Sequence, residues 1–328
     1  MADVIPPWQR DGDGQRSDRG QLFLIGALAL AVLLITVALL LNTAIYTENL
    51  ATRSDGADSA EVLGYQTAAQ THAATELRSV NREHNTSDAT PYQDLEENYT
   101  TSMDTWDETA AIHQAGKGSV ASVTLADTTD GTRIVQNESQ AFTDANGANN
   151  WTLASSANAR NYTLTVEDDP ELEGSVQGNL TSDPVFKILF DSSSVTIYVY
   201  RNESSGQLAV AVDDSGTIES RNFSSNVRID ITNATVNGEH WEILEFFDEL
   251  GDDYDVSYEN GNNVTGTYSL TVDRQFSTLD DSRYNNDDSG SSPWITPALY
   301  DADFELVYES PETYYQSQYR IAPGEPDA

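Results

Sequence analysis

Cysteine is absent from the 328 residues of this chain, and lysine occurs only at positions 117 and 187. Without a thiol, the chain cannot form disulfide bonds, cysteine-ligated zinc sites or iron–sulfur clusters, and it cannot use thiol catalysis. These absences remove several classes of enzyme and metalloprotein before any motif is considered.

Positive charge is also scarce, because 16 Lys and Arg face 54 Asp and Glu, for a formal net charge of −38. A sequence-independent nucleic-acid binder needs Lys and Arg against phosphates, so we expect no nucleic-acid partner. Such a charge repels itself unless salt screens it, and in molar salt the Debye length falls to about 3 Å. The acidic, lysine-poor composition resembles that of proteins from salt-in halophilic archaea. Disorder is the competing explanation, but the alternating segments described below disfavour it.

One long apolar run stands near the N-terminus. Between Leu22 and Leu41, Thr36 is the only polar side chain, and 14 of the 20 residues are Leu, Ile, Val or Phe. Twenty helical residues span about 30 Å, and these side chains favour insertion by roughly 4–8 kcal/mol. A cleaved secretory signal has an apolar region of only about 7–15 residues. The run therefore predicts a transmembrane helix over residues 21–45, with the lipid bilayer as a partner.

Three arginines, at positions 10, 16 and 19, precede this run. Cations beside a membrane segment favour the cytoplasmic side. We therefore expect a single-pass protein of the cell membrane, with a cytoplasmic N-terminus and a large extracellular domain.

The junction Ser17-Asp18-Arg19-Gly20-Gln21 leads directly into the apolar run. It resembles the class III signal of archaeal type IV pilins and archaellins, and the stretch from Gln21 to Arg53 is similar to uncharacterised pilin-like proteins of haloarchaea. The resemblance implies that a prepilin peptidase cuts between Gly20 and Gln21, and that other pilin-like subunits are partners. It departs from bacterial pilins at Ile25, where those proteins carry Glu. The alternative is an uncleaved signal anchor.

Helical patterns follow the apolar run. Asn42–Arg53 can continue the helix, Ser54-Asp55-Gly56 predicts a break, and a second helix is expected from about Ser59 to Arg82. Thr90-Pro91 then predicts a helix start. An apolar stripe at three- and four-residue steps predicts a helix face buried against a sheet, with an end at Ala115–Ser119; the stripe is Tyr92, Leu95, Tyr99, Met103, Trp106 and Ala110.

From about Val120 the apolar period changes to two, which predicts short antiparallel strands. Residues 195–200 and 208–212 predict a hairpin around Asn202–Gly206, and Asp213–Gly216 predicts another turn. Glu242–Leu250 has a helical pattern. The expected fold class is α+β: an N-terminal transmembrane helix, a helical stem and a sandwich-like antiparallel β-rich ectodomain. The expected boundaries are 1–20 for a cytoplasmic N-terminal region or leader, 21–45 for the membrane helix, 46–118 for the helical stem, 119–321 for the β-rich extracellular domain and 322–328 for a tail.

Catalytic and metal-binding motifs are missing from the sequence. The four histidines, at positions 72, 84, 113 and 240, form no H-E-x-x-H, and no G-x-S-x-G occurs. Adjacent acids such as Asp168-Asp169 and Asp213-Asp214 are expected by chance in so acidic a chain, and no complete calcium loop is present. We expect no enzymatic activity, no metal site and no cofactor.

N-x-S/T motifs exceed chance, and all ten follow the apolar run, several of them at expected turns. They are possible N-glycosylation sites. Composition bias is the alternative, since Asn, Ser and Thr all favour turns. The ten acceptors are Asn85, Asn98, Asn137, Asn150, Asn161, Asn179, Asn202, Asn222, Asn233 and Asn263.

These observations together predict a non-enzymatic, membrane-anchored surface protein. The resemblance favours a minor pilin-like subunit of an archaeal type IV pilus-like system. The alternative is a signal-anchored surface glycoprotein that acts as a binding or envelope module.

Overall fold

The computed structural model describes residues 14–83, 91–191, 193–251, 253–285 and 292–324. Within the first helix, side chains are described for residues 27, 28, 30–39 and 59–83. The chain divides into two compact units, Met1–Leu63 and Gly64–Ala328, and each is considered by itself.

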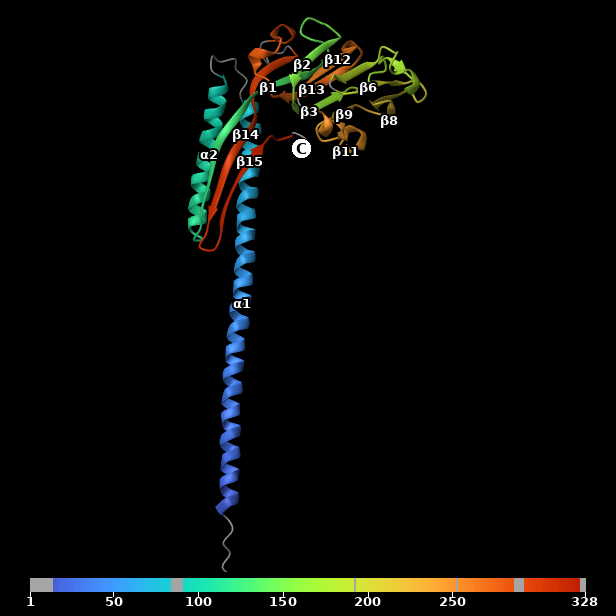
Figure 1. Cartoon of the computed structure of the whole chain (residues 1–328). Coiled ribbons are helices and arrows are strands. Elements are labelled where there is room, and N and C mark those ends of the chain that lie inside the picture. The colour runs from blue at the N-terminus through green and yellow to red at the C-terminus, as the bar shows by residue number, and fades with distance from the viewer. Residues whose placement is uncertain (1–13, 84–90, 192, 252, 286–291, 325–328) are drawn as a thin grey trace, which may run out of the picture. The chain divides into compact units, whose positions relative to one another are not determined.

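Two α-helices precede the sheets in the chain (Figure 1). Helix α1 runs from Gly14 to Glu83 and contributes its last residues to the second unit, while α2 (Pro91–Ala115) belongs wholly to that unit. Within the described residues, five short 3₁₀ helices lie among the strands: η1 (Gln177–Asn179), η2 (Glu242–Glu249), η3 (Gly261–Asn263), η4 (Phe276–Thr278) and η5 (Asp281–Arg283).

The strands of the second unit form two sheets. The eight-stranded sheet has the order β11-β10-β9-β3-β13-β1-β14-β15, with β11 (Glu239–His240), β10 (Thr235–Val236), β9 (Val227–Asp230), β3 (Ala159–Val166), β13 (Thr265–Val272), β1 (Val120–Ala141), β14 (Trp294–Glu309) and β15 (Tyr314–Ile321). The seven-stranded sheet has the order β2-β12-β5-β6-β7-β8, with β2 (Trp151–Ala157), β12 (Tyr254–Glu259), β5 (Phe186–Phe190), β6 (Val195–Asn202), β7 (Gln207–Asp214) and β8 (Thr217–Phe223), while β4 (Gly174–Ser175) pairs with β6. Among the named strands that the structure describes, only β4 and β6 pair in parallel.

The main hydrophobic core is made by residues of both sheets and is rich in aromatic rings. Phe142, which follows β1, packs edge-on against Tyr268 of β13 at 5.2 Å between ring centroids, and Tyr258 of β12 packs edge-on against Tyr268 at 5.4 Å. The Tyr162 hydroxyl of β3 donates to the Tyr258 hydroxyl at 3.0 Å. Edge-to-face rings and paired hydroxyls allow large amphipathic side chains to fill the interior of the sandwich.

Helix α2 packs on the N-terminal half of β1 and on β14, where these long strands extend beyond the sandwich (Figure 1). Leu95, Tyr99 and Met103 are buried on one face of α2. The Tyr99 hydroxyl donates to the carbonyl of Ala73 in α1 at 3.3 Å. In the second unit α1 buries its own stripe at helical spacing, formed by Tyr65, Ala69, Ala73, Leu77 and Val80. The two helices thus share an apolar layer that covers one face of the β1–β14 pair.

Asn81 of α1 fixes a distortion in β14. Its Nδ2 donates to the Leu299 carbonyl and its Oδ1 accepts from the Leu299 N–H, both at 2.8 Å. The β1–β14 register shifts at this point, between Thr129 and Asp130, so the ladder cannot satisfy every backbone group. The buried Asn81 amide supplies the missing partners.

Several locally encoded elements are confirmed. Helix α2 begins at Pro91 and ends at Ala115, and β1 begins at Val120. The expected hairpin is β6–β7, in which Asn202 pairs with Gln207. The next turn, between β7 and β8, has positive φ at Ser215 and Gly216, as a two-residue type I′ turn requires. The helical pattern from Glu242 appears as the 3₁₀ helix η2.

The expected fold class is wrong, because the structure is mostly antiparallel β-sheet, with 44% strand and 31% helical residues. The expected membrane helix over residues 21–45 is not supported either. In the part of the chain that the structure describes, no helix combines the length and the apolar character needed to cross a membrane. The apolar run is one part of α1, a helix of 70 residues that continues through polar and charged residues on both sides of it.

The expected break at Ser54-Asp55-Gly56 is also wrong, since α1 is one continuous helix of 70 residues. Small and polar residues at three adjacent positions lower helix propensity, but they do not end a helix that is already propagating, because each added residue gains a backbone hydrogen bond.

Candidate interaction and modification sites

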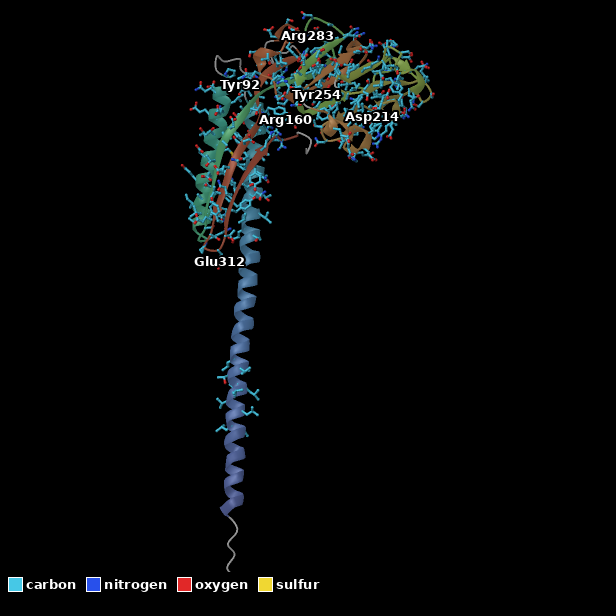
Figure 2. The ribbon with its side chains drawn as sticks, viewed as in Figure 1. Tyr92, Arg160, Asp214, Tyr254, Arg283 and Glu312 are labelled. Atoms are coloured by element: carbon cyan, nitrogen blue, oxygen red, sulfur yellow. The ribbon has the colours of Figure 1, made fainter. Side chains whose placement is uncertain are left out.

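The first candidate site is the apolar segment of α1, defined here as residues 28–39. Its large side chains are 50–63% exposed: Leu28, Leu30, Val32, Leu33, Leu34, Ile35, Val37 and Leu39. Figure 2 shows the side chains of this segment projecting from the helix on more than one side. Consecutive helical residues lie 100° apart, so the run from Val32 to Ile35 presents apolar surface almost all the way round.

Thr36 is the polar exception within this segment. Its hydroxyl donates back to the Val32 carbonyl at 2.6 Å and lies 3.1 Å from the Leu33 carbonyl. A threonine that bonds within its own helix leaves no donor for water or for a partner. The segment therefore offers only shape and apolar surface, which suits the packing of another apolar helix.

The residues of the expected leader cleavage all lie inside α1. Arg19, Gly20 and Gln21 belong to the helix that begins at Gly14. Cleavage between Gly20 and Gln21 stays a prediction.

The second candidate site is the set of glycan acceptors. Asn85 lies outside the described residues. Six of the others are exposed: Asn98 on α2, Asn137 on β1, Asn150, Asn179 at the end of η1, Asn222 on β8 and Asn233 between β9 and β10. Exposure is what a glycan acceptor needs, because the sugar has to occupy space outside the chain.

Asn233 and the remaining three asparagines use their Nδ2 atoms as hydrogen-bond donors. Asn161 donates to the Pro323 carbonyl at 2.8 Å, and Asn202 donates to Asn222 Oδ1 at 2.9 Å. Asn233 donates to Asp230 Oδ1 at 2.9 Å, and Asn263 donates to the Pro184 carbonyl at 2.5 Å. Nδ2 is the atom that would carry the sugar, so the fold separates the acceptors into two groups that the motif alone does not distinguish.

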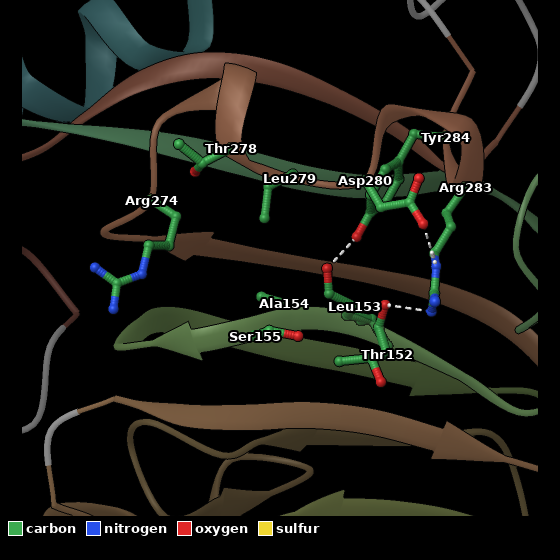
Figure 3. Close-up of a pocket in the computed structure, with 10 residues that line it drawn as sticks. All are labelled: Thr152, Leu153, Ala154, Ser155, Arg274, Thr278, Leu279, Asp280, Arg283 and Tyr284. Atoms are coloured by element: carbon green, nitrogen blue, oxygen red, sulfur yellow. Dashed lines mark hydrogen bonds and ion pairs between the residues drawn. The ribbon is translucent and has the colours of Figure 1, made fainter.

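A cavity of about 350 Å³ lies between β2 and the segment that holds η4 and η5 (Figure 3). Arg283 crosses it, with Nη1 3.2 Å from the Thr152 carbonyl and Nε 3.0 Å from Asp280 Oδ2. Arg274 pairs with Asp253. Hydrogen bonds from Ser282 and Arg283 hold the pKa of the Asp280 carboxyl below its usual range. Both guanidinium groups are thus already matched by carboxylates, so the cavity offers an anion little net charge.

The histidines do not gather into a site within the described structure. His72 stacks on Trp106, with 5.5 Å between the ring centroids and 14° between the planes, and His240 lies 3.0 Å from Glu245. His84 is outside the described residues. Among the side chains that are described, no group of three His, Cys, Asp or Glu is placed to hold a metal ion.

Sequence reasoning missed one site, the buried Arg160 at the start of β3. It is 1% exposed, and its guanidinium donates to the Pro323 carbonyl at 2.6 Å and to the Leu299 carbonyl at 3.0 Å. The available signal was an arginine at the edge of an alternating apolar strand, between Ala159 and Tyr162. Which groups it binds is not encoded locally, because they lie more than a hundred residues away in the chain.

Comparison with known proteins yields one similarity. Residues 16–152 match a family described as "Family of unknown function (DUF7261)". This range covers most of α1, all of α2 and β1, and the beginning of β2, which is less than half of the chain. No curated protein and no solved structure matches. None of these comparisons supports the expected similarity to type IV pilins. The similarity shows that the helices and β1 recur together in other chains.

Proposed function

We propose that the protein is a structural subunit that associates with further copies of itself through the apolar segment of α1, residues 28–39. The observation that carries this proposal is the exposure of eight large apolar side chains within twelve residues of one helix. A helix that is hydrophobic all round is normally buried, and contiguous apolar surface of this kind marks an interaction site.

The occupant of this surface is another copy of the same segment. Thr36 is satisfied within its own helix, so two such segments can meet without leaving a polar group unpaired. Alanines at positions 27 and 31 lie one turn apart and are both exposed, and small side chains at that spacing allow helix axes to approach closely. The segment carries no charge that would specify a different partner.

The energy of this association can be bounded. Full burial of a Leu, Ile or Val side chain is worth about 1.5–3 kcal/mol, so eight of them are worth roughly 12–24 kcal/mol. When two copies meet, each buries about half of that surface, so the pair together gains roughly the same 12–24 kcal/mol, against an estimated 4–15 kcal/mol for association itself. A single partner is therefore sufficient, and further copies can cover the half that stays exposed.

Negative charge outside the apolar segment opposes this assembly. Three of the cations and four of the acids lie in residues 1–41, so residues 42–328 carry 13 cations against 50 acids. Copies that meet through α1 bring these acidic parts together, and salt shortens the range of their repulsion. We therefore expect self-association to strengthen as the salt concentration rises.

The absence of cysteine permits a direct test. Leu33→Cys, Leu34→Cys and Ile35→Cys together sample three directions around the helix, since each step turns it by 100°. In molar KCl with a mild oxidant, we expect at least one variant to form a disulfide-linked dimer on non-reducing gels. Ile112→Cys on α2 is the matched control, because Ile112 is an apolar residue with 76% exposure.

The proposal fails if all three α1 variants stay monomeric under these conditions. It also fails if Ile112→Cys forms dimers to the same extent, because collision alone would then account for the crosslink. Formation of dimers by α1 variants and not by Ile112→Cys is the result that supports it.

A further inference from the structure

The C-terminal segment Ala322–Gly324 is held against the start of β3. The Asn161 N–H donates to the Gly324 carbonyl at 2.8 Å. Arg160 Nη1 and Asn161 Nδ2 both donate to the Pro323 carbonyl, at 2.6 and 2.8 Å. Three hydrogen bonds to two successive carbonyls place this short segment at one position on the sheet.

The side chain that binds the Pro323 carbonyl is itself buried and held in place. Arg160 is 1% exposed, it also donates to the Leu299 carbonyl at 3.0 Å, and its guanidinium carbon lies 5.4 Å from the centre of the Tyr300 ring. A guanidinium presents its donors in a rigid planar fork. With one end of the fork fixed on β14, the other end is held in place for Pro323.

Asn161 is also the acceptor of an N-x-T motif, with Tyr162 and Thr163 after it. The docked segment occupies the space around its side-chain amide. Gly324 has a φ of +78°, and a Cβ added to it would lie 1.9 Å from Asn161 Oδ1 and 2.6 Å from Asn161 Cγ. Where a single methyl group does not fit, a sugar on the adjacent Nδ2 has no room.

We propose that docking of Ala322–Gly324 closes Asn161 to N-linked glycosylation, and that the segment acts as a built-in gate on this one acceptor. In the modification, Asn161 Nδ2 forms a bond to the anomeric carbon of a sugar carried on a phosphate leaving group. The bond from that carbon to the phosphate oxygen breaks, the phosphate departs with the electron pair, and Nδ2 releases one proton. The co-reactant is thus a phosphate-activated glycan, and a sugar transferase of the cell supplies the catalysis.

Asn179 provides the contrast. It lies at the end of η1 and is exposed, and the structure shows no acceptor for its Nδ2 among the described residues. Both acceptors fall in one tryptic peptide, residues 161–187, because no Lys or Arg lies between Arg160 and Lys187. This proposal requires that the cell glycosylates N-x-S/T motifs of the protein. It does not depend on self-association through α1.

The experiment is mass spectrometry of peptide 161–187 from full-length protein made in a host that N-glycosylates. In the wild type we expect a glycan on Asn179 and a bare Asn161. Gly324→Ala introduces the clash that displaces the segment, and a chain ending at Ile321 removes it. Both should raise occupancy of Asn161 several-fold. Gly147→Ala is the matched control, since Gly147 also has a positive φ (+84°) but no atom within 4 Å of an added Cβ.

Three results would overturn the gate: a glycan on wild-type Asn161 as abundant as on Asn179, an Asn161 that stays bare in both tail variants while Asn179 is modified, or a peptide with no glycan at either position. An increase at Asn161 in Gly147→Ala equal to that in Gly324→Ala would also overturn it, because general loosening of the fold would then explain the change.

Discussion

Replacement of Asn81 by Leu should remove the contact that joins α1 to the distorted part of β14. Leu has the same branching and the same number of side-chain heavy atoms as Asn, so the change deletes hydrogen bonds without opening a cavity. The variant loses the Asn81 Nδ2 donor to the Leu299 carbonyl and the Oδ1 acceptor for the Leu299 N–H. The carbonyl keeps its bond from Arg160 Nη2 at 3.0 Å, but the N–H is left buried without its acceptor.

The magnitude follows from these two losses. A net intramolecular hydrogen bond contributes about 0.5–1.5 kcal/mol, and a buried donor left unsatisfied costs about 1–3 kcal/mol. Burial of the added methyl groups returns about 1 kcal/mol. The free energy of unfolding of the second unit should therefore fall by roughly 1–3 kcal/mol, which corresponds to a drop in Tm of about 2–9 °C.

The assay is urea and thermal unfolding followed by circular dichroism, at one fixed KCl concentration in the molar range. The matched control is Asn98→Leu, an Asn to Leu change at an exposed position of α2. We expect the control to change stability by less than about 0.5 kcal/mol. If Asn81→Leu unfolds at the same urea concentration as Asn98→Leu, the amide does not stabilise β14 and the reasoning is refuted.

Two further predictions concern salt and pH. Because residues 42–328 carry 13 cations against 50 acids, the sheet signal in circular dichroism should weaken as KCl is diluted from molar concentration, and a spectrum fully retained at ~50 mM would contradict this. Burial raises the pKa of the Asp107 carboxyl, against hydrogen bonds from the Val123 N–H at 2.7 Å and from Tyr65. The folded state therefore binds this proton more tightly than the unfolded state, so stability should increase as the pH falls toward the ordinary Asp pKa and should be lost as the pH rises through the raised value. In thermal melts between about pH 7 and pH 4.5, the Tm of Asp107→Asn should rise less on acidification than the Tm of the wild type. A variant with the same dependence of Tm on pH as the wild type would contradict the raised pKa of Asp107.

The sequence by itself determined the elements whose signals are local. Pro91 at a helix start, Asp213–Gly216 at a turn and the alternation on both sides of Asn202–Gly206 act over a few residues, and the structure has α2, the β7–β8 turn and the β6–β7 hairpin at these positions. The N-x-S/T motifs and the apolar run were also visible as patterns, because they are defined by the residue types themselves.

Only the tertiary structure decided which of these features are available to a partner. Asn161 and Asn179 have equivalent motifs, yet Pro323 and Gly324 cover the first, while the second is exposed at the end of η1. Asn81 and Leu299 are 218 residues apart, and Arg160 and Pro323 are 163 apart. Contacts of this kind produce no periodic pattern in the local sequence, because the pairing of β1 with β14 and the packing of the helices determine which residues meet. The continuity of α1 through Ser54-Asp55-Gly56 was misjudged for the related reason that propensity describes residues one at a time, whereas helix propagation is cooperative.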